Sequence, residues 1–516
     1  MLQAFTAGQV RSAEEPLLAA GQGAALMQKA AHGLFAVAAG MLRDSGGLYG
    51  RTVVVLAGGG NNGGDALYAA ARLARRGMGA TAIALSERIH PDALAVFTAA
   101  GGRLERLTAD NTDALAARCA AADLIIDGVL GTGASGALRG PVANLIDAVN
   151  AKAGPRGDRR PQVLACDGPS GVDLDSGRIE GPVLRADATA TFGAAKAGLL
   201  TGAGALAAGE LNVIDIGLGL SNGAAPAPAI RRLELADAAA LYRRPRTADH
   251  KYTRGVLGIA AGSEQYPGAA VLATGAALAT GIGMVRYLGP RSVGALINSV
   301  HPEAVCSTGG VAEARSQAWL VGPGAVGDPE QARRARDAIT SGLPVVVDAG
   351  ALAEVPRTVG PQVILTPHAG ELVAFLGGRG RPVTRDAIEA SPAEYALETA
   401  RLTGATVLLK GYTTVTAAPS GEVFSQADAT PWLATAGSGD TLAGILGALA
   451  AAAAGDGPAA ARAGVPEGAK WAAVAAAAAL IHGRAGQRAA RRGPVIVSDL
   501  PGEIGAVVAG LLAVPD

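Results

Sequence analysis

The stretch VVVLAGGGNNGGDALYAAARLARRG, from Val53 to Gly77, decides the fold of the first half of the chain. A run of β-branched and apolar residues leads into a glycine-rich turn and then into an Ala/Leu-rich segment, which predicts a buried parallel strand, a tight loop and a helix. Loop glycines let the backbone approach a ligand closely, and the free N–H groups at the start of a helix favour an anion. The sequence therefore predicts a binding site for a phosphate-bearing ligand after this strand.

The loop also fits a known but weak pattern. Gly58, Gly60 and Gly63 satisfy G-x-G-x-x-G, and Glu87 follows the next strand at about the spacing of a dinucleotide ribose contact. The same glycines are equally typical of a tight strand-to-helix turn. A nicotinamide dehydrogenase is one function that this pattern leaves open.

The strand–turn–helix order returns along the whole chain. Apolar runs that end in glycine-rich or acidic turns lie at 122–127, 162–167, 186–192, 255–262, 318–324, 344–350, 362–370 and 406–411. This alternation predicts the α/β class with two parallel-sheet units. The segment SNGAAPAPAIRR, residues 221–232, is rich in Pro, Gly and Ala without periodicity, so we place the boundary near Ala225, between domains 1–224 and 225–516.

Composition excludes several classes of protein. Lys and Arg number 44, as do Asp and Glu, so the formal net charge of +0 gives no overall attraction to nucleic acid or to a membrane, and we expect neither as a partner. A hydrophobic share of 49% excludes global disorder. The 3 cysteines lack metal-ligand spacing, the N-terminus lacks a signal-peptide pattern, and the apolar runs look too short to span a bilayer, so we expect a cytoplasmic protein.

Polar side chains follow the predicted strands of the first half. Asn61, Asn62 and Asp65 place amide and carboxylate groups where a pure phosphate loop would use bare backbone, and Asp127 and Asp167 end later strands. The carboxyl ends of parallel strands lie at one edge of a sheet, which is where ligands bind. Oxygen ligands from Asn62, Asp127 and Ser170 can therefore converge on one hard cation, although both aspartates also fit the plainer role of capping turns.

Four ordered segments, at 58–66, 127–141, 167–177 and 191–199, resemble the N-terminal domain of the bifunctional NAD(P)H-hydrate repair enzymes. The resemblance implies a Rossmann-like domain that epimerises hydrated NADH or NADPH at the ring carbon that carries the added hydroxyl. It implies an acid/base role for Asp167, with Lys196 as its electrostatic partner, and K⁺ on Asn62, Asp127 and Ser170. The residues that it places around the dinucleotide are Asn61, Asn62, Gly63, Gly64, Asp65, Gly131, Thr132, Gly133, Ala134, Ser135, Gly136, Ala137 and Asp167.

The second half carries its own phosphate-type motif. In ATAGSGDTLAGILGALAAA, residues 434–452, Gly437, Ser438 and Gly439 precede a long Ala/Leu helix and Asp440 falls in its first turn. Helix N-terminal amides can hold a transferring phosphate while the adjacent carboxylate accepts a hydroxyl proton. An aspartate that only caps the helix is the alternative.

G-S-G-D at the start of a helix resembles the ribokinase-like superfamily, and the segments 250–273, 320–328, 345–352, 365–377 and 408–417 resemble the ADP-dependent NAD(P)H-hydrate dehydratases. The resemblance implies a ribokinase-like domain in which ADP phosphorylates the ring hydroxyl with Mg²⁺ present, phosphate then leaves, and AMP and the reduced dinucleotide remain. Asp440 is then the catalytic base. The hydrate would contact Ala269, Gly324, His368 and Asp440, and the adenine nucleotide would contact Lys410, Gly411, Tyr412, Thr413, Thr414 and Gly439.

Two features leave questions for the structure. The dehydratase pattern leads us to expect Asp-Ala-Asp at 348–350, but this chain has Gly350, and Glu371 fits either a magnesium site or a helix cap. A ribokinase-like kinase for a small molecule or vitamin precursor, fused to a non-catalytic nucleotide-binding domain, is the alternative function. We expect small-molecule substrates, namely hydrated NADH or NADPH and ADP, and a homo-oligomer.

Overall fold

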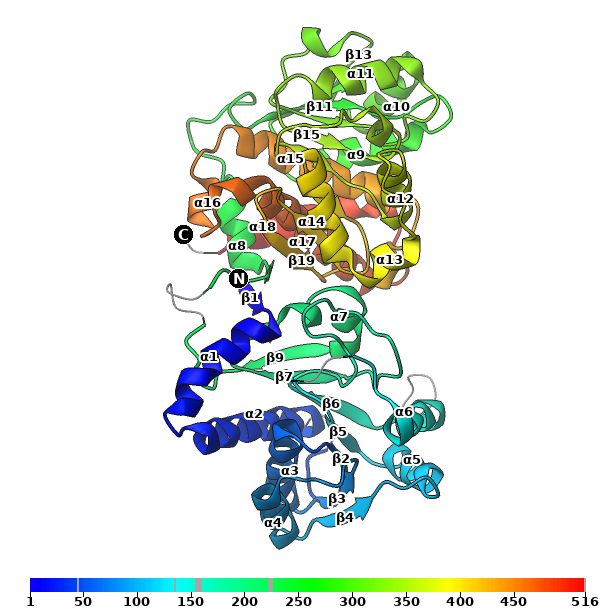
Figure 1. Ribbon diagram of the computed structural model, residues 1–516. Coiled ribbons are helices and arrows are strands. Elements are labelled where there is room, and N and C mark those ends of the chain that lie inside the picture. Colours follow the sequence, from blue (N-terminus) through cyan, green and yellow to red (C-terminus); the bar gives the residue numbers. More distant parts are fainter. Residues whose placement is uncertain (44–45, 134–135, 154–159, 221–225, 515–516) are drawn as a thin grey trace. The chain divides into compact units, whose positions relative to one another are not determined.

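The chain is described by a computed structural model that covers residues 1–43, 46–133, 136–153, 160–220 and 226–514. It forms two compact units: an N-terminal unit, Gln3–Ala229, and a C-terminal unit, Ile230–Asp516 together with Met1–Leu2 (Figure 1). The expected boundary near Ala225 falls within 221–225, outside the described residues.

The N-terminal unit contains a parallel sheet of seven strands in the order β4-β3-β2-β5-β6-β7-β9. Its strands are β2 (Thr52–Ala57), β3 (Gly79–Ala84), β4 (Arg103–Arg106), β5 (Leu124–Gly128), β6 (Gln162–Cys166), β7 (Ala188–Phe192) and β9 (Glu210–Ile214). Strand β1 (Leu2–Phe5) pairs in parallel with β8 (Ala195–Lys196). The helices are α1 (Ala7–Ala19), α2 (Gly23–Arg43), α3 (Asn61–Ala74), α4 (Pro91–Ala99), α5 (Thr112–Ala120), α6 (Gly140–Ala153) and α7 (Gly202–Ala208).

Helices cover both faces of this sheet, as an all-parallel sheet requires. In β2, Val53 and Val55 pack into a core with α2, α3 and α4, whereas Val54 and Leu56 pack into a second core with α5 and α6. Each buried strand therefore reads as a continuous apolar run, which is why these strands could be located from the sequence.

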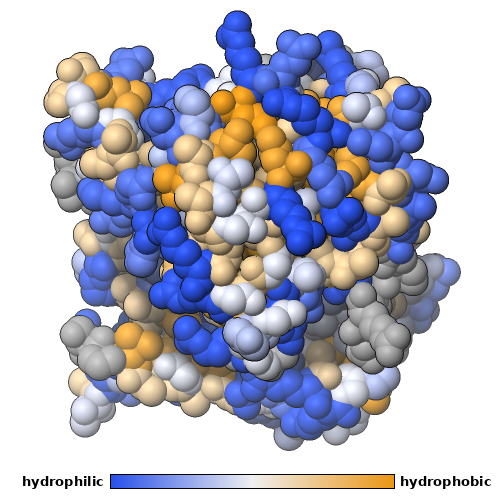
Figure 2. All heavy atoms as spheres, turned by 90° about the horizontal axis from the view of Figure 1, so that it is seen from below, coloured by the Kyte–Doolittle hydropathy of each residue, from blue (hydrophilic) through white to orange (hydrophobic). Residues whose placement is uncertain are grey.

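Helix α2 is a feature that the sequence analysis did not single out. By length and composition it could cross a membrane, but its buried residues recur along one face and contact α3, β7 and β9. A helix with one buried face is typical of a packed core. Figure 2 shows one face of the molecule, on which hydrophilic residues surround an area of hydrophobic residues.

The C-terminal unit has the strand order β13-β12-β11-β14-β15-β16-β17-β18-β19-β10. Its strands are β10 (Ile230–Arg232), β11 (Val256–Ala260), β12 (Met284–Leu288), β13 (Val305–Ser307), β14 (Ala318–Val321), β15 (Val345–Val347), β16 (Val363–Leu365), β17 (Thr406–Leu409), β18 (Thr414–Ala417) and β19 (Val423–Gln426). Only β18 runs antiparallel to its neighbours among these described strands.

The helices of this unit are α8 (Leu235–Leu241), α9 (Pro267–Ala279), α10 (Arg291–Val300), α11 (Pro329–Ile339), α12 (Ala369–Gly377), α13 (Arg385–Ala390), α14 (Pro392–Thr403), α15 (Ser438–Ala454), α16 (Ala459–Arg462), α17 (Lys470–Ala490) and α18 (Leu500–Leu512). Alanine-rich α15 and α17 pack against each other, and α15 packs closely on α9, in one large core. Alanine lets these helices approach closely while keeping a high helix propensity. Two α/β units with parallel sheets confirm the predicted fold class.

Candidate active sites

The loop after β2 lies where the strand order of the N-terminal sheet reverses. Strands β3 and β4 lie on one side of β2, whereas β5 and β6 lie on the other, and ligands of open parallel sheets bind at such a point. A Cβ on Gly58 would come within 2.1 Å of the Val129 carbonyl oxygen, and one on Gly63 within 2.2 Å of the Gly58 carbonyl oxygen. Both positions therefore need glycine so that this loop can pack against the loop after β5.

The three predicted cation ligands belong to one hydrogen-bonded group around Leu130. The Asn62 side-chain amide donates to the Leu130 carbonyl (2.9 Å) and to the Cys166 carbonyl (2.8 Å). The Leu130 N–H donates to the Ser170 hydroxyl (2.9 Å), and that hydroxyl donates to Asp127 (2.6 Å). The structure thus brings Asn62, Asp127 and Ser170 together.

The Asp127 carboxylate is buried, and burial raises its pKa although the Ser170 and Val129 donors oppose the rise. No Lys or Arg of the described residues forms an ion pair with it. A buried carboxylate without a cationic partner is costly, so a cation bound beside this group would offset its charge.

A pocket of about 230 Å³ lies beside this group. It includes the predicted residues Gly131, Gly136 and Ser170. A Cβ on Gly131 would lie 2.3 Å from the Asn62 side-chain oxygen, whereas one on Gly133 would meet nothing within 4 Å. The pocket is lined by Leu130, Gly131, Gly136, Gly168, Pro169, Ser170, Gly171, Val172 and Leu174.

Asp167 adopts a left-handed backbone with a φ of 68°, which is costly for a residue with a side chain and is typical of functional sites. Lys196 donates from its ammonium group to Asp167, and also to the Thr191 hydroxyl (3.0 Å) and the Phe192 carbonyl (2.9 Å). The Phe192 N–H donates to the same Asp167 oxygen (3.1 Å). The two side chains, exposed by only 4% and 1%, form a buried ion pair, so Lys196 is not a surface lysine.

Asp65 lies in the first turns of α3 and is buried. One of its carboxyl oxygens has no hydrogen-bond partner among the described residues. Burial, together with the negative charges of Asp167 and Glu14, raises its pKa well above the usual range.

The remaining predicted residues of this unit differ in their environment. Asn61 begins α3 and is exposed, Gly64 packs against the His90 ring, and Thr132 accepts a hydrogen bond from Arg11. Ala134 and Ser135 lie outside the described residues, and Ala137 lies next to Gly181.

Sequence reasoning missed helix α1. Arg11 of this helix contacts the loop after β5, and Glu14, one turn later, interacts electrostatically with Lys196 and Asp167. No motif marks either residue, because their role depends on tertiary packing.

In the C-terminal unit the strand order reverses at β11, which lies between β12 and β14. The loops after β11 and β14 meet there, since the Gly262 N–H donates to the Pro323 carbonyl (2.7 Å). A Cβ on Gly324, whose φ is +63°, would lie 2.7 Å from both the Ala269 Cβ and the Tyr266 carbonyl oxygen. Two predicted substrate contacts, Ala269 and Gly324, are thus neighbours at this edge.

Charged residues from three further strand ends gather beside the start of α15. The Lys410 ammonium donates to Asp348 (2.8 Å) and lies 3.6 Å from Glu371, and the Thr366 hydroxyl also donates to Asp348 (2.8 Å). Burial and the neighbouring Asp348 charge raise the pKa of Asp440 to about 6, although Lys410 opposes the rise. An aspartate with this pKa is a base at neutral pH that can still accept a proton.

His368 and Glu371 cap helix α12 reciprocally. The Glu371 side chain accepts from the His368 N–H (2.8 Å), and the His368 Nδ1 accepts from the Glu371 N–H (3.1 Å). Glu371 is therefore a helix cap that also lies near Lys410. His368 adjoins Lys410 through a parallel bridge, and its side chain is 59% exposed and accessible to a ligand.

The glycine loop before α15 has the geometry of an anion site. Gly437 has a φ of 87°, and α15 begins at Ser438 with Asp440 in its first turn. The Ser438 N–H donates to the Thr435 carbonyl (3.3 Å), so the amides of Gly439 and Asp440 are the first-turn donors that face a ligand. A Cβ on Gly439 would lie 3.7 Å from the Lys410 ammonium, so these two predicted nucleotide contacts are adjacent. Behind them, the Ser438 hydroxyl and the buried His482 Nε2 are 3.3 Å apart, and burial lowers the pKa of His482 to about 4.

The loop 410–414 turns from β17 into β18. Thr413 is buried, and its hydroxyl has no hydrogen-bond partner among the described residues, whereas Tyr412 is exposed. A buried hydroxyl without a partner fits a polar ligand at this loop. At Gly350 a Cβ would lie 3.5 Å from the Ala325 carbonyl, which is ordinary contact, so packing does not require glycine there.

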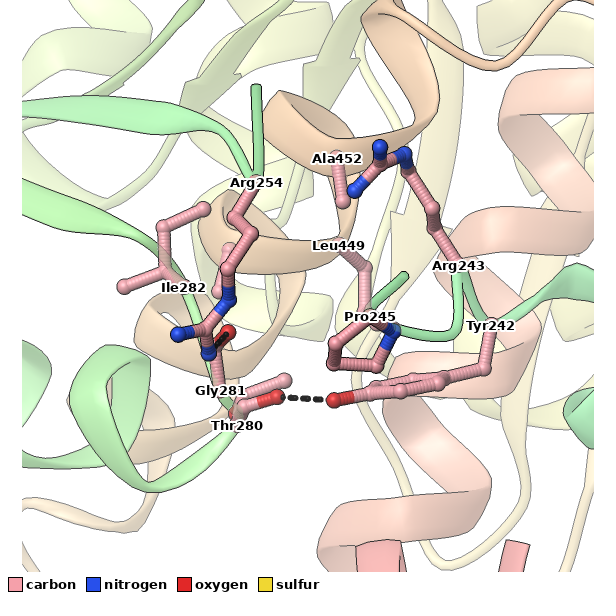
Figure 3. A pocket seen from close by; sticks show the side chains of 10 residues that line it. Tyr242, Arg243, Pro245, Arg254, Thr280, Gly281, Ile282, Leu449 and Ala452 are labelled. Carbon is pink, nitrogen blue, oxygen red and sulfur yellow. Dashed lines mark hydrogen bonds between the residues drawn. The ribbon is translucent and has the colours of Figure 1, made fainter. Parts of the chain in front are cut away.

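A pocket of about 300 Å³ lies elsewhere in the C-terminal unit (Figure 3). It adjoins the C-terminal part of α15, far along the helix from Asp440, and contains no predicted site residue. Its lining residues are Tyr242, Arg243, Pro245, Arg254, Thr280, Gly281, Ile282, Ala448, Leu449 and Ala452.

Comparison with known proteins identifies the family. Residues 23–198 match the model described as YjeF-related protein N-terminus, and residues 257–506 match the NAD(P)H-hydrate dehydratase model. A bifunctional NAD(P)H-hydrate repair enzyme of Mycobacterium tuberculosis is 41% identical over 87% of this chain and 89% of its own. An NAD(P)H-hydrate epimerase of Clavibacter michiganensis is 45% identical over 43% of this chain and 93% of its own.

Among solved structures, the ADP/ATP-dependent NAD(P)H-hydrate dehydratase of Bacillus subtilis, co-crystallised with ATP and Mg²⁺, is 27% identical and covers 55% of this chain and 99% of its own, with a TM-score of 0.46. Because both halves have matching relatives, a kinase fused to a non-catalytic domain is not favoured. The chain belongs to the family of bifunctional NAD(P)H-hydrate repair enzymes, with one epimerase domain and one dehydratase domain.

Proposed function

We propose that residues 1–224 interconvert the R and S epimers of hydrated NADH and NADPH, and that residues 225–516 dehydrate the S epimer with ADP as the phosphoryl donor. One observation carries the proposal. Each unit has a buried or half-buried carboxyl, Asp167 after β6 or Asp440 in the first turn of α15, near the positive charge of a lysine. Two separate reaction centres suit two successive reactions on one damaged cofactor.

In the epimerase domain, the hydroxyl leaves from a ring carbon that is also bonded to the ring nitrogen, so the nitrogen lone pair stabilises the cation that forms. Asp167 moves the proton, and its ion pair with Lys196 holds the carboxylate in position. The dinucleotide lies along Asn61–Asp65 and the loop 131–137, beside the pocket that contains Gly131 and Gly136.

Potassium fits the group formed by Asn62, Asp127 and Ser170. All three offer oxygen atoms, and Asp127 is a buried carboxylate without a cationic partner in the described part of the chain. When bound, K⁺ would offset the charge of Asp127 and so stabilise the loops after β2, β5 and β6 around the dinucleotide.

In the dehydratase domain, Asp440 accepts the proton of the ring hydroxyl as the hydroxyl attacks the terminal phosphorus of ADP. The amides at the start of α15 hold the transferring phosphoryl group, and Lys410 with Gly439 and the loop to Thr414 holds the nucleotide. Phosphate is a far better leaving group than hydroxide, so its departure, followed by loss of a proton from the adjacent ring carbon, regenerates the reduced ring. The hydrate contacts Ala269, Gly324 and His368.

Magnesium fits this site together with the bound nucleotide, because Mg²⁺ is commonly held by phosphates with one or two carboxylates. Asp348 and Glu371 are the nearby carboxylates, and Lys410 contacts both. When bound, Mg²⁺ would offset the charge on the phosphates.

Product analysis tests the dehydratase reaction. We expect the S hydrate and ADP to give NADPH, AMP and inorganic phosphate in equal amounts, and Asp440→Asn to stop all three. A phosphorylated dinucleotide that accumulates without NADPH would contradict the proposal. Parallel reactions with ADP and with ATP identify the phosphoryl donor. A second series on the R hydrate, in which Na⁺ replaces K⁺, identifies the cation that the epimerase uses.

A further inference from the structure

Helix α1 precedes residues 23–198, the segment that the family model matches, yet it lies on the epimerase reaction centre. Its first N–H group, at Ala7, donates to Asp175 (2.6 Å), which belongs to the segment 167–177 that begins with Asp167. Thr6 and Gln9 form a capping box at the same end. The helix is therefore fixed in position relative to the site.

Two side chains of α1 face the site. Glu14 is near enough to Lys196 and Asp167 that both charges affect its pKa, which burial raises. Arg11 lies one turn earlier and donates from its guanidinium to the Thr132 carbonyl. Three residues along a helix span about 5 Å, so Arg11 and Glu14 connect the loop 131–133 with the Asp167–Lys196 pair.

A phosphate that binds at this centre would lie near several carboxyl groups, so a cation that is not already paired would favour its binding. Glu14, Asp65 and Asp167 are three carboxyl groups, and Lys196 is already paired with Asp167. A dinucleotide brings two more negative phosphates into this surrounding. Arg11 forms no ion pair with any carboxylate of the described residues, and one contact to Thr132 leaves most of its five N–H donors available.

We propose that α1 is part of the epimerase site and that Arg11 binds a phosphate of the hydrated dinucleotide. This inference rests on the proposed epimerase function. Because Arg11 also contacts Thr132, it orients the loop 131–133 toward the same phosphate. A guanidinium is suited to this, since it can form two parallel hydrogen bonds with one phosphate.

The test uses the full chain with the purified R hydrate of NADPH, ADP and Mg²⁺, and follows the return of reduced nicotinamide absorbance. Conversion of the R epimer then reports the epimerase, whereas a parallel sample with the purified S hydrate reports the dehydratase. The variants are Arg11→Met, which removes the charge, Arg11→Lys, which keeps it, and Arg103→Ala on the exposed edge strand β4 as the matched control.

We expect Arg11→Met to raise the epimerase KM about tenfold with little change in kcat, and to weaken the dependence of KM on salt. Arg11→Lys should recover much of the affinity, and Arg103→Ala should resemble the wild type. Dehydration of the S epimer should be unchanged in all three.

Two outcomes would overturn the inference. An unchanged KM in Arg11→Met would show that Arg11 does not bind substrate, and a fall in kcat and thermal stability at constant KM would show that it only supports the loop. A wild-type chain that fails to convert the R epimer would contradict the proposed epimerase function itself, and the inference with it.

Discussion

The acid limb of the dehydratase pH profile provides a sharp test of Asp440 as the catalytic base. Its pKa of about 6 means that about nine-tenths of the groups are ionised at pH 7 but only about one-tenth at pH 5. Only the ionised form can accept the hydroxyl proton, so kcat/KM for the S hydrate should fall as the pH drops through 6.

The perturbation is Asp348→Asn. The negative charge of Asp348 helps to raise the pKa of Asp440. Asp348 also forms an ion pair with Lys410, which weakens the effect of the Lys410 charge on Asp440. Asparagine keeps an oxygen that can accept from the Thr366 hydroxyl, but it removes the repulsion and leaves Lys410 freer to stabilise the Asp440 carboxylate. A unit charge several ångströms away at an effective dielectric of about 20 contributes on the order of 2 kcal/mol, so allowing for solvent screening we expect a downward shift of about one pH unit.

The assay measures NADPH recovery from the S hydrate between pH 5 and 8 for the wild type, Asp348→Asn and the exposed control Asp337→Asn. At pH 5 the wild type should keep about one-tenth of its maximal kcat/KM and the Asp348→Asn variant about half. The phosphates of the nucleotide titrate in the same range, but identically for every variant, so the shift is diagnostic. Superimposable acid limbs in the wild type and Asp348→Asn would refute the assignment of this limb to Asp440.

Three further predictions concern the rest of the chain. Gly131→Ala should abolish epimerisation, because its Cβ would lie 2.3 Å from the Asn62 side-chain oxygen, whereas Gly40→Ala in α2 has open space and should stay active; equal rates would contradict the loop geometry. Lys196→Met should lower the free energy of unfolding of the N-terminal unit by about 3–5 kcal/mol, since it leaves Asp167 buried and unpaired, and the double variant with Asp167→Asn should recover part of the loss in a denaturant titration. Chelation of Mg²⁺ should stop dehydration of the S hydrate while interconversion of the epimers, followed by chromatography, continues; loss of both activities would disprove separate sites.

Much of the fold could be predicted from the sequence because parallel strands are buried on both faces. Runs such as 53–57 and 344–347 are continuously apolar and are followed by glycine or aspartate, and the structure has strands at both places. The strands β10, β13 and β19 were not predicted, since they are short and their pairing depends on segments distant in the sequence.

The candidate sites also contain some residues that the sequence predicted and others that it did not. The local pattern predicted that Asp127 lies at the end of a strand and Asp440 in the first turn of a helix, and both lie there in the structure. Other features depend on tertiary contacts. The burial of Lys196 and the contact of Arg11 with Thr132 follow from packing between segments that no local spacing relates. The cap that Glu371 forms on α12 is local, and the sequence analysis named it as one of two alternatives.

The measurement that tests the central claim most directly is complete recovery of an epimer mixture. The full chain would be incubated with R and S hydrates of NADPH, ADP, Mg²⁺ and K⁺, beside an Asp167→Asn variant, while the reduced nicotinamide absorbance is recorded. We predict that the wild type restores both epimers rapidly and that the variant restores the S epimer rapidly and the R epimer only at the spontaneous rate. Rapid recovery of both epimers by Asp167→Asn, or recovery of the S epimer alone by the wild type, would contradict a two-site repair enzyme in which Asp167 drives the first step.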